Sequence, residues 1–454
     1  MKYFTLFLAI QICTSFAAEK ITFDKHIKAL FKEHCLNCHN PDKSKAGLDL
    51  SSYEATLKGG SSGEILKAGA PDTSLLYMTV THHEDAEAMP PKKPKLENEK
   101  IALFREWILG GLLENEGGES KLRKIEFNVA AGSSDKPAVL PMPGQLPGAK
   151  NASKIPVIQA MASSPWAPLL AVGGHGEVLL YKTDKESKNL LGALPFDEGV
   201  IYDLKFSKNG SILIASGGVG AKSGKVVLYD LIKGVKITSL ADEQDVILAA
   251  DISADHKYLA IGTPFRMIKI FDVKSGRMLH RIKKHTDWVT AVSFSPKGDQ
   301  FATGDRNGGI HIWEAGLGGI VLSLSDHKKK INSLVWRADA QMLASASEDG
   351  KFILWDMKDG WPAKVVDAHV KKSEVRYTKT TGVLSLDWNR NGKLVTVGRD
   401  KTVKLWNADG SKLTKKGIEQ KTLMTAVSLS EDGETVFAGG FNGQLSMVSV
   451  NEVK

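Results

Sequence analysis

One pattern of hydrophobic and polar positions repeats along roughly the last two thirds of the chain. Short segments of alternating apolar and polar residues, most with an aromatic residue near their end, recur about every 42 residues. Alternation with a period of two predicts strands with one buried face and one exposed face. The segments are 176–181, 224–230, 266–272, 309–314, 351–356, 402–407 and 443–448. The pattern predicts an all-β region of seven repeats between residues 155 and 454.

The first part of the chain has a helical periodicity instead. Apolar residues recur at helical spacing over 23–31 and again over 98–109, where Gly110 and Gly111 end the segment. From 121 to 154 Ala, Gly, Ser, Pro and Lys dominate, which is typical of a semi-extended linker. The sequence therefore predicts a small all-α domain at 18–120, a linker at 121–154 and the repeat region at 155–454.

The fifth repeat contains a set of polar residues that suggests how the repeats are held together. His327, Ser345, Asp349 and Trp355, with the repeat length and the aromatic strand, resemble the WD repeat. The resemblance implies a seven-bladed β-propeller with four short strands per blade, in which these side chains bond in a chain. A His-Ser-Asp set can also form a nucleophilic triad, but its recurrence at the repeat spacing favours the structural interpretation.

The neighbouring repeats have only part of this set. In the fourth repeat, Asn307 stands where the Asp is expected. In the sixth repeat, an insertion at 371–380 displaces His369 relative to Asp400, so their hydrogen bond is not predicted. The sequence predicts the complete polar network in the fifth repeat alone.

The N-terminus has the features of an export signal. Lys2 provides a positive charge, an apolar run covers residues 3–12, and the small residues Ser15 and Ala17 precede a cleavage site. The run is about half as long as a membrane span, and no later stretch is long and apolar enough to cross a bilayer. We predict a signal peptide at 1–17 and a mature protein that is periplasmic or otherwise exported, without a membrane span.

Removal of the signal, together with Cys13, leaves Cys35 and Cys38 as the cysteines of the mature chain. They belong to the segment Cys-Leu-Asn-Cys-His at 35–39, and this spacing is the attachment motif of a c-type haem. The two thiols bond to vinyl groups on one edge of the porphyrin, which brings the ring of His39 to the iron. A thioredoxin-like pair would sit in a βαβ pattern, and a zinc site would need further ligands; the sequence provides neither.

The second axial ligand of the iron would come from Met78, His82, His83 or Met89. Met89 precedes two prolines, which stiffen the backbone and hold a thioether in place. Met78 stands in an apolar segment typical of a core helix, and the two histidines are predicted to be solvated loop residues. We predict His39 and Met89 as axial ligands. This pair leaves no open coordination position, which favours electron transfer over oxygen or peroxide chemistry.

Segments 34–39, 45–50, 88–91 and 101–111 together resemble the planctomycete-type cytochrome c domain. The resemblance covers residues 20–115 and implies one covalent haem c held by Cys35, Cys38 and His39, with Met89 assigned by its motif context. One departure is Glu97, where helices of this family often begin with Ser or Thr. This weakens the helix cap and does not affect the haem residues.

The formal net charge of +8 is concentrated in the repeat region. Because we expect export, we expect no nucleic acid partner, and the charge favours a solvated surface or an anionic protein partner. In WD propellers, the turns between second and third strands share one rim with the loops before each first strand. The docking residues predicted on this rim are Trp288, Arg306, Lys328, Lys329, Lys330 and Arg399. The alternative is a solvated, lysine-rich surface with Trp288 packed on a neighbouring blade.

The last repeat ends at its third strand, near Val450. Its outer strand must therefore come from elsewhere, because an unpaired edge invites aggregation. We predict that a segment before Ile155 supplies it, either the alternating stretch 125–129 or residues near 150.

Together these predictions describe a two-domain protein, an all-α cytochrome c domain followed by a seven-bladed propeller. Its predicted function is that of an exported single-haem c-type cytochrome for one-electron transfer, with the propeller as a docking scaffold for a redox partner. Two alternatives remain: a propeller-based redox enzyme that uses the cytochrome as its electron relay, and a haem-dependent sensor or adaptor. Haem-d nitrite reductases also join a cytochrome c to a propeller, but theirs has eight blades and a second haem.

Overall fold

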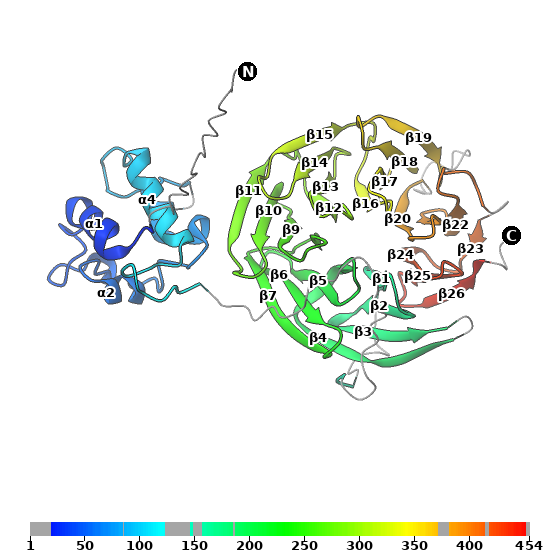
Figure 1. Ribbon diagram of the computed structural model, residues 1–454, viewed down its shortest axis with the longest axis horizontal. Coiled ribbons are helices and arrows are strands. Elements are labelled where there is room, and N and C mark those ends of the chain that lie inside the picture. The colour runs from blue at the N-terminus through cyan, green and yellow to red at the C-terminus, as the bar shows by residue number, and fades with distance from the viewer. Residues whose placement is uncertain are drawn as a thin grey trace, which may run out of the picture. The chain divides into compact units, whose positions relative to one another are not determined.

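The computed structural model describes residues 20–84, 86–122, 146–148, 157–184, 187–370, 381–413 and 417–450. The chain divides into two compact units, Met1–Arg123 and Lys124–Lys454. In the described residues the first unit is helical and the second consists of β-sheets (Figure 1). The predicted signal peptide and most of the predicted linker lie outside the described residues and remain predictions.

The helical unit is built around one core of aromatic and aliphatic side chains. Its helices are the π-helical turn η1 (Phe23–Ile27), α1 (Lys28–His34), α2 (Tyr53–Lys58), α3 (Leu75–Val80) and α4 (Asn98–Leu109), with short 3-10 turns η2 (Lys45–Gly47) and η3 (Pro71–Thr73). Phe31, Phe104 and Trp107 are fully buried in this core. The indole N–H of Trp107 donates to Leu113 O at 2.9 Å, so its polar atom is satisfied inside the core.

Both helices predicted from apolar spacing are present, and α4 has the predicted bounds. Ser52 caps α2 by accepting a hydrogen bond from Ala55 N at 3.2 Å, whereas Glu97 at the start of α4 makes no side-chain cap. Because the cap is missing, the start of α4 depends on the packing of its buried face. None of the described helices has the length and apolar character needed to cross a membrane.

The second unit contains six antiparallel sheets in its described residues. The largest has the order β1-β2-β3-β4-β5-β6-β7, with β1 (Met161–Ser163), β2 (Leu169–Gly173), β3 (His175–Thr183), β4 (Lys188–Phe206), β5 (Ile212–Val219), β6 (Ser223–Asp230) and β7 (Val235–Glu243). Two four-stranded sheets follow, with β8 (Ala249–Ile252), β9 (Tyr258–Gly262), β10 (Met267–Asp272) and β11 (Met278–Lys283), then β12 (Val289–Phe294), β13 (Gln300–Asp305), β14 (Ile310–Glu314) and β15 (Ile320–Leu324).

Two more four-stranded sheets and one three-stranded sheet complete this unit. They comprise β16 (Ile331–Trp336), β17 (Met342–Ser347), β18 (Lys351–Asp356) and β19 (Pro362–Asp367), then β20 (Val383–Trp388), β21 (Leu394–Gly398), β22 (Thr402–Trp406) and β23 (Ile418–Glu419), and finally β24 (Met424–Leu429), β25 (Thr435–Gly440) and β26 (Leu445–Ser449). The alternating segments predicted from the sequence lie in β3, β6, β10, β14, β18, β22 and β26.

The sheets of this unit are arranged as a propeller (Figure 1). First strands of neighbouring sheets contact each other in the series β8–β12, β12–β16, β16–β20 and β20–β24, and β24 contacts β1. At this last joint Ile158 N donates to Gly440 O at 3.2 Å, and Ser163 N donates to Ser428 Oγ at 3.0 Å. The ring is therefore closed by hydrogen bonds between residues from the two ends of the repeat region.

Strand β4 belongs to two parts of its sheet. Its residues up to Pro195 pair with β3, Val200 pairs with both β3 and β5, and the residues from Ile201 onward pair with β5. One uninterrupted strand thus joins the outer edge of β1–β3 to the beginning of β5–β7.

The last sheet has three strands among the described residues, and β26 is its outer one, as predicted. Residues 125–129 and 149–156, where we predicted the closing strand, lie outside the described residues. The short segment 146–148 is described, and it lies against the first sheet: Ala193 N donates to Pro147 O at 2.9 Å. A Cβ on Gly192 would stand 2.6 Å from Leu146 Cβ, so this close approach requires a glycine.

The inner strands surround a cavity of about 590 Å³. The side chains of Asp203, Asp251 and Asp387 line it, and burial raises the pKa of each, that of Asp203 to about 6. Each carboxylate accepts a backbone N–H from the following sheet, donated by Ala250, Phe294 and Leu429 at 3.2, 2.7 and 2.8 Å, respectively. These side chains therefore link successive sheets along the cavity wall.

Candidate haem site and docking rim

The Cys-x-x-Cys-His segment follows directly on α1. Cys35 is the C-cap of this helix and donates its N–H to Phe31 O at 2.8 Å. Cys38 N and His39 N both donate to Cys35 O at 3.1 Å, so the chain makes a further turn that keeps the three side chains in one compact segment. Packing of α1 in the core thus fixes where the motif begins.

Both thiols are free and half-buried. Burial raises the pKa of the Cys35 thiol to about 11, so this thiol is protonated at neutral pH, unlike the reactive thiol of a thioredoxin-like pair. His39 Nδ1 is buried without a hydrogen-bond partner in the part of the chain that the structure describes, and Nε2, the nitrogen that would reach an iron, makes no hydrogen bond there either. A buried imidazole nitrogen without a partner is costly, and it leaves bonding capacity at this site that the described protein does not use. The residues present at 35–39 therefore fit the attachment of a haem.

The loop that carries Met89 is tied back to α3. Met89 N donates to Thr79 O at 3.0 Å, and His82 Nε2 lies 3.2 Å from Met89 O. Met89 is half-buried, and Met78 lies within α3, in the helix predicted for it. This contact ties the His82 ring to the backbone of the loop that contains Met89, which the sequence did not suggest. Met89 as a ligand remains a prediction.

No group of three or more His, Cys, Asp or Glu side chains in the described ranges is arranged to hold a free metal ion.

The fifth repeat forms the polar network that the resemblance implied. His327 Nδ1 lies 2.8 Å from Asp349 Oδ2, and His327 Nε2 lies 2.8 Å from Ser345 Oγ. The indole N–H of Trp355 donates to the same hydroxyl at 2.7 Å. The hydroxyl is thus shared between the histidine and the tryptophan and joins the loop before β16 to β17 and β18.

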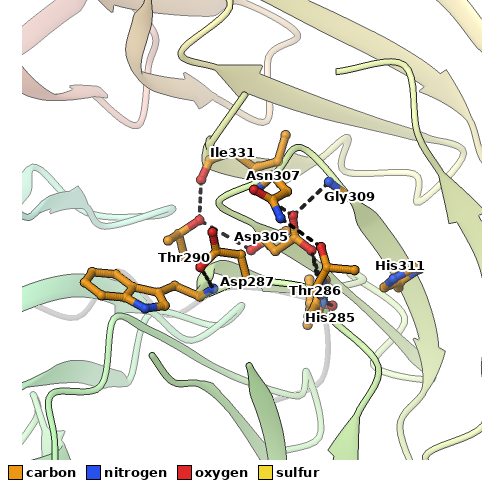
Figure 2. A network of polar contacts seen from close by, with 12 residues as sticks. His285, Thr286, Asp287, Thr290, Asp305, Asn307, Gly309, His311 and Ile331 are labelled. Atoms are coloured by element: carbon orange, nitrogen blue, oxygen red, sulfur yellow. Dashed lines mark hydrogen bonds and ion pairs between the residues drawn. The ribbon is translucent and has the colours of Figure 1, made fainter. Parts of the chain in front are cut away.

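The fourth repeat completes its network with a residue that we did not predict. His285 Nδ1 lies 2.9 Å from Asp305 Oδ2, so Asp305 takes the role expected of position 307 (Figure 2). Asp305 Oδ1 accepts the backbone N–H groups of Asn307 and Gly309, each at 2.9 Å. Asn307 stands at the position expected for the Asp, and the carboxylate two residues earlier, at the end of β13, replaces it because it reaches both the histidine and the turn.

The sixth repeat also forms its network, contrary to our expectation. His369 Nδ1 lies 2.7 Å from Asp400 Oδ1, and His369 Nε2 lies 2.8 Å from Thr396 Oγ1. The insertion at 371–380 enters the chain after His369, so it leaves the position of the ring unchanged. Gly398 was a usable signal, since a Cβ there would lie 2.3 Å from the ring of His369.

The residues predicted for docking lie in loops that contact each other. Trp288 precedes β12, and Arg306 follows β13; the Arg306 guanidinium carbon stands 5.0 Å from the centroid of the indole ring. Trp288 is 44% exposed. Lys328 and Lys329 are exposed before β16, whereas Lys330 is half-buried there.

Arg399, which follows β21, binds Glu348 through two hydrogen bonds of 2.7 and 2.9 Å. Glu348 N in turn donates to Lys330 O at 2.9 Å. Glu348 therefore connects the loop before β16 to the turn after β21.

Two family models match separate parts of the chain. The model of the planctomycete cytochrome C family matches residues 35–93, and the model of the WD domain, G-beta repeat, matches residues 276–314, 318–356 and 371–407. The cytochrome match begins at Cys35 and includes Met89. The repeat matches cover β11–β18 and β20–β22.

Several relatives found by sequence are named WD repeat-containing proteins, and others have different names. WD repeat-containing protein 1 of Gallus gallus is 29% identical over 163 residues, which are 35% of this chain and 26% of that protein. Protein NEDD1 of Homo sapiens is 25% identical over 56% of this chain and 37% of its own length. Autophagy-related protein 16 of Arabidopsis thaliana is 26% identical over 56% of this chain and 48% of its own length. The chain thus spans less than half of each of these relatives.

A chain in the crystal structure of the mitotic checkpoint complex has a similar fold, with a TM-score of 0.54 and 19% sequence identity. The similarity covers 71% of this chain and 99% of that chain. The chain therefore joins a planctomycete cytochrome c domain, matched at 35–93, to WD40 repeats of a β-propeller, matched at 276–407.

Proposed function

We propose that this protein is an exported c-type cytochrome with one covalent haem, and that it transfers single electrons. The observation that carries the proposal is the Cys-x-x-Cys-His segment after α1, with two free thiols and a His39 ring that has no hydrogen-bond partner in the described residues. The family match over 35–93 supports haem c as the cofactor.

Four side chains would hold the group. Cys35 and Cys38 would form the thioether bonds, and His39 and Met89 would be the axial ligands. When bound, the haem supplies a one-electron couple. The protein contributes the apolar surroundings of Cys35 and the hydrogen bonds that hold the Met89 loop on α3. If His39 and Met89 both bind the iron, the haem offers no free site to a substrate, which would favour electron transfer over catalysis.

We further propose that the propeller has seven blades. The largest sheet supports this count because β4 pairs with β3 over its first part and with β5 over its second part. Dividing β4 near residue 197 turns this seven-stranded sheet into two repeats of four strands. The other five sheets contribute one repeat each, the last of them with three described strands.

The propeller would act as the docking scaffold. WD repeats mediate protein association in many proteins, and Trp288, with Arg306 beside it, is of the residue types most often found as binding anchors. The rim residues Trp288, Arg306, Lys328, Lys329, Lys330 and Arg399 would meet a partner with complementary, acidic charge.

The haem proposal is tested by spectroscopy of the mature protein and two variants. We expect covalently bound haem on a denaturing gel, a low-spin spectrum, and slow or absent binding of carbon monoxide by the reduced wild type. Met89→Ala should open the sixth position, giving a high-spin spectrum and carbon monoxide binding. Met78→Ala, which removes a thioether from α3, is the matched control and should leave the spectrum unchanged.

A wild-type protein that is already high-spin would exclude Met89 as the ligand and favour the sensor function. A protein that carries no covalent haem after export would overturn the proposal as a whole.

A further inference from the structure

Three cations and one carboxylate lie near enough on the rim of the propeller to act electrostatically on one another. They are Arg306 after β13, Lys330 before β16, Arg399 after β21 and Glu348 after β17. Glu348 accepts both hydrogen bonds of its bidentate pair from Arg399, so the charge of that guanidinium is balanced. The positive charges of Arg306 and Lys330 are left without a carboxylate of their own in this cluster.

Lys330 is the cation of this cluster whose charge is desolvated without a hydrogen bond or ion pair to compensate it in the described residues. Its side chain is half-buried, and its ammonium group has no hydrogen bond or ion pair within the described part of the chain. Burial lowers the pKa of Lys330, Arg306 and Arg399 lower it further, and Glu348 opposes them. A desolvated cation that has cationic neighbours would be stabilised by an added anion.

The backbone around Lys330 is already fixed. Its carbonyl oxygen accepts the N–H of Glu348 at 2.9 Å. The hydroxyl of Thr290 donates to Ile331 O at 2.6 Å, so β12 holds the next residue (Figure 2). A ligand therefore meets a loop whose backbone is already ordered, which lowers the entropic cost of binding.

The surroundings of the cluster also identify the kind of ligand. Trp288 is 44% exposed, with the Arg306 guanidinium 5.0 Å from its ring centroid. A small anion would leave this indole uncovered, whereas a peptide can place an apolar side chain on it. Asp287, also in this region, is outweighed by the exposed Lys328 and Lys329, so the local charge remains positive.

We propose that Arg306 and Lys330 bind the carboxylate of an Asp or Glu residue in an acidic segment of a partner protein. Arg399 orients the cluster through Glu348, and Trp288 packs against an apolar residue next to that carboxylate. The inference rests on the proposed role of the propeller as a docking scaffold, and it specifies the chemistry of the segment that docks.

A selection experiment tests the inference without knowledge of the natural partner. A random peptide library is selected against the full-length mature protein, and the affinity of one enriched peptide, made synthetically, is then measured. We expect enrichment of Asp or Glu beside a large apolar residue. Lys330→Gln should weaken binding of that peptide about tenfold or more, because a charge-assisted bond to a half-buried group is lost.

Lys358→Gln is the matched control, since it removes the same charge from an exposed residue after β18 that is not among the proposed rim residues. It should change the affinity by less than about threefold. Arg306→Gln should behave like Lys330→Gln, and because Arg306 is exposed, this variant keeps the test valid if Lys330→Gln fails to fold. Thermal melting of each variant checks the fold.

Equal losses in Lys330→Gln and Lys358→Gln, or enrichment of peptides without acidic residues, would overturn the inference, as would a selection that yields no binder. Peptide binding is measured without any redox partner. Its failure is therefore distinguishable from failure of the haem proposal, which is tested by the haem spectrum alone.

Discussion

At the scale of single residues, Asp305 holds the fourth repeat together. Its carboxylate joins the buried ring of His285 to the turn between β13 and β14. Asp305→Ala leaves His285 Nδ1 buried without its acceptor, and we expect the free energy of unfolding to fall by about 2–4 kcal/mol. Denaturant unfolding of the full-length protein, monitored by tryptophan fluorescence, measures the change.

Asn307→Ala is the control for this prediction. The side chain of Asn307 is exposed and donates to Thr286 Oγ1 at 3.1 Å, so its loss should cost less than about 1 kcal/mol. A larger effect of Asn307→Ala than of Asp305→Ala would restore position 307 to the role that the repeat pattern first suggested.

Asp203 makes the stability of the propeller depend on pH. Burial at the cavity wall raises its pKa from the usual 3.8 to about 6, although the charge of Lys205 opposes this. The folded protein then holds the proton more tightly than the unfolded chain does, so stability falls as the pH rises from about 4 to about 6. At pH 7 Asp203→Asn should be more stable than the wild type by up to about 3 kcal/mol, because it removes the cost of a buried charge.

Urea unfolding at several pH values measures this dependence. An asparagine can still accept the N–H of Ala250, so the link between the sheets is retained in the variant. The account of Asp203 is wrong if the variant and the wild type show the same pH dependence between pH 4 and pH 7.

The polar networks show what the sequence could reveal about single residues. The fifth repeat was predictable because its four residues stand at the family spacing. The role of Asp305 was not predictable, because its hydrogen bond with His285 joins two segments that are 20 residues apart in the sequence, and Asp305 does not stand at the family spacing. Lys330 and the two arginines that lower its pKa, Arg306 and Arg399, come from three separate loops. No local sequence pattern indicates that they act on one another.

At the scale of elements, the segment 146–148 depends on a glycine in β4. A Cβ on Gly192 would stand 2.6 Å from Leu146 Cβ and 2.8 Å from Pro147 O. Gly192→Ala should therefore push this segment away from the first sheet or lower the stability by about 1–3 kcal/mol. Thermal melting and limited proteolysis after residue 145 would detect the two outcomes.

Gly220→Ala provides the comparison, because a Cβ there would meet nothing within 4 Å. If both variants melt and are cleaved like the wild type, the contact between this segment and β4 does not contribute to stability.

The regular elements were the most predictable part of the molecule. Alternation located the third strands, and the apolar stripe gave the bounds of α4, because both periodicities follow from burying one face. The continuity of β4 was not predictable in this way. Alternation shows which face of a strand is buried, but it does not show where the strand changes its hydrogen-bonding partner.

At the scale of the whole molecule, the positive rim should make partner association sensitive to salt. Exposed charges steer a partner through electrostatic interactions, and 0.1 M salt screens these interactions beyond ~10 Å. Reversing Lys328, Lys329 and Lys330 to Glu should lower the association rate at low salt and flatten its dependence on ionic strength. Stopped-flow mixing with the natural redox partner measures both, and an unchanged rate and salt slope would exclude this rim as the docking face.

The overall organisation was predictable because its signals are local. The Cys-x-x-Cys-His segment and the repeat length each lie within one short stretch, and the family matches fall on these same stretches. The segment that provides the outer strand of the last sheet could not be predicted from such local signals, because it depends on which distant part of the chain pairs with β26.

The uninterrupted β4 also bears on how such a ring can change over evolutionary time. Repeat proteins gain and lose whole repeats where a flexible connection allows the chain to be cut and rejoined. Between the first two proposed repeats no such connection exists, because the backbone passes from one ladder to the next within a single strand. Duplication or deletion of one of these two repeats alone would break both ladders. We therefore expect the first two repeats to be inherited as a pair.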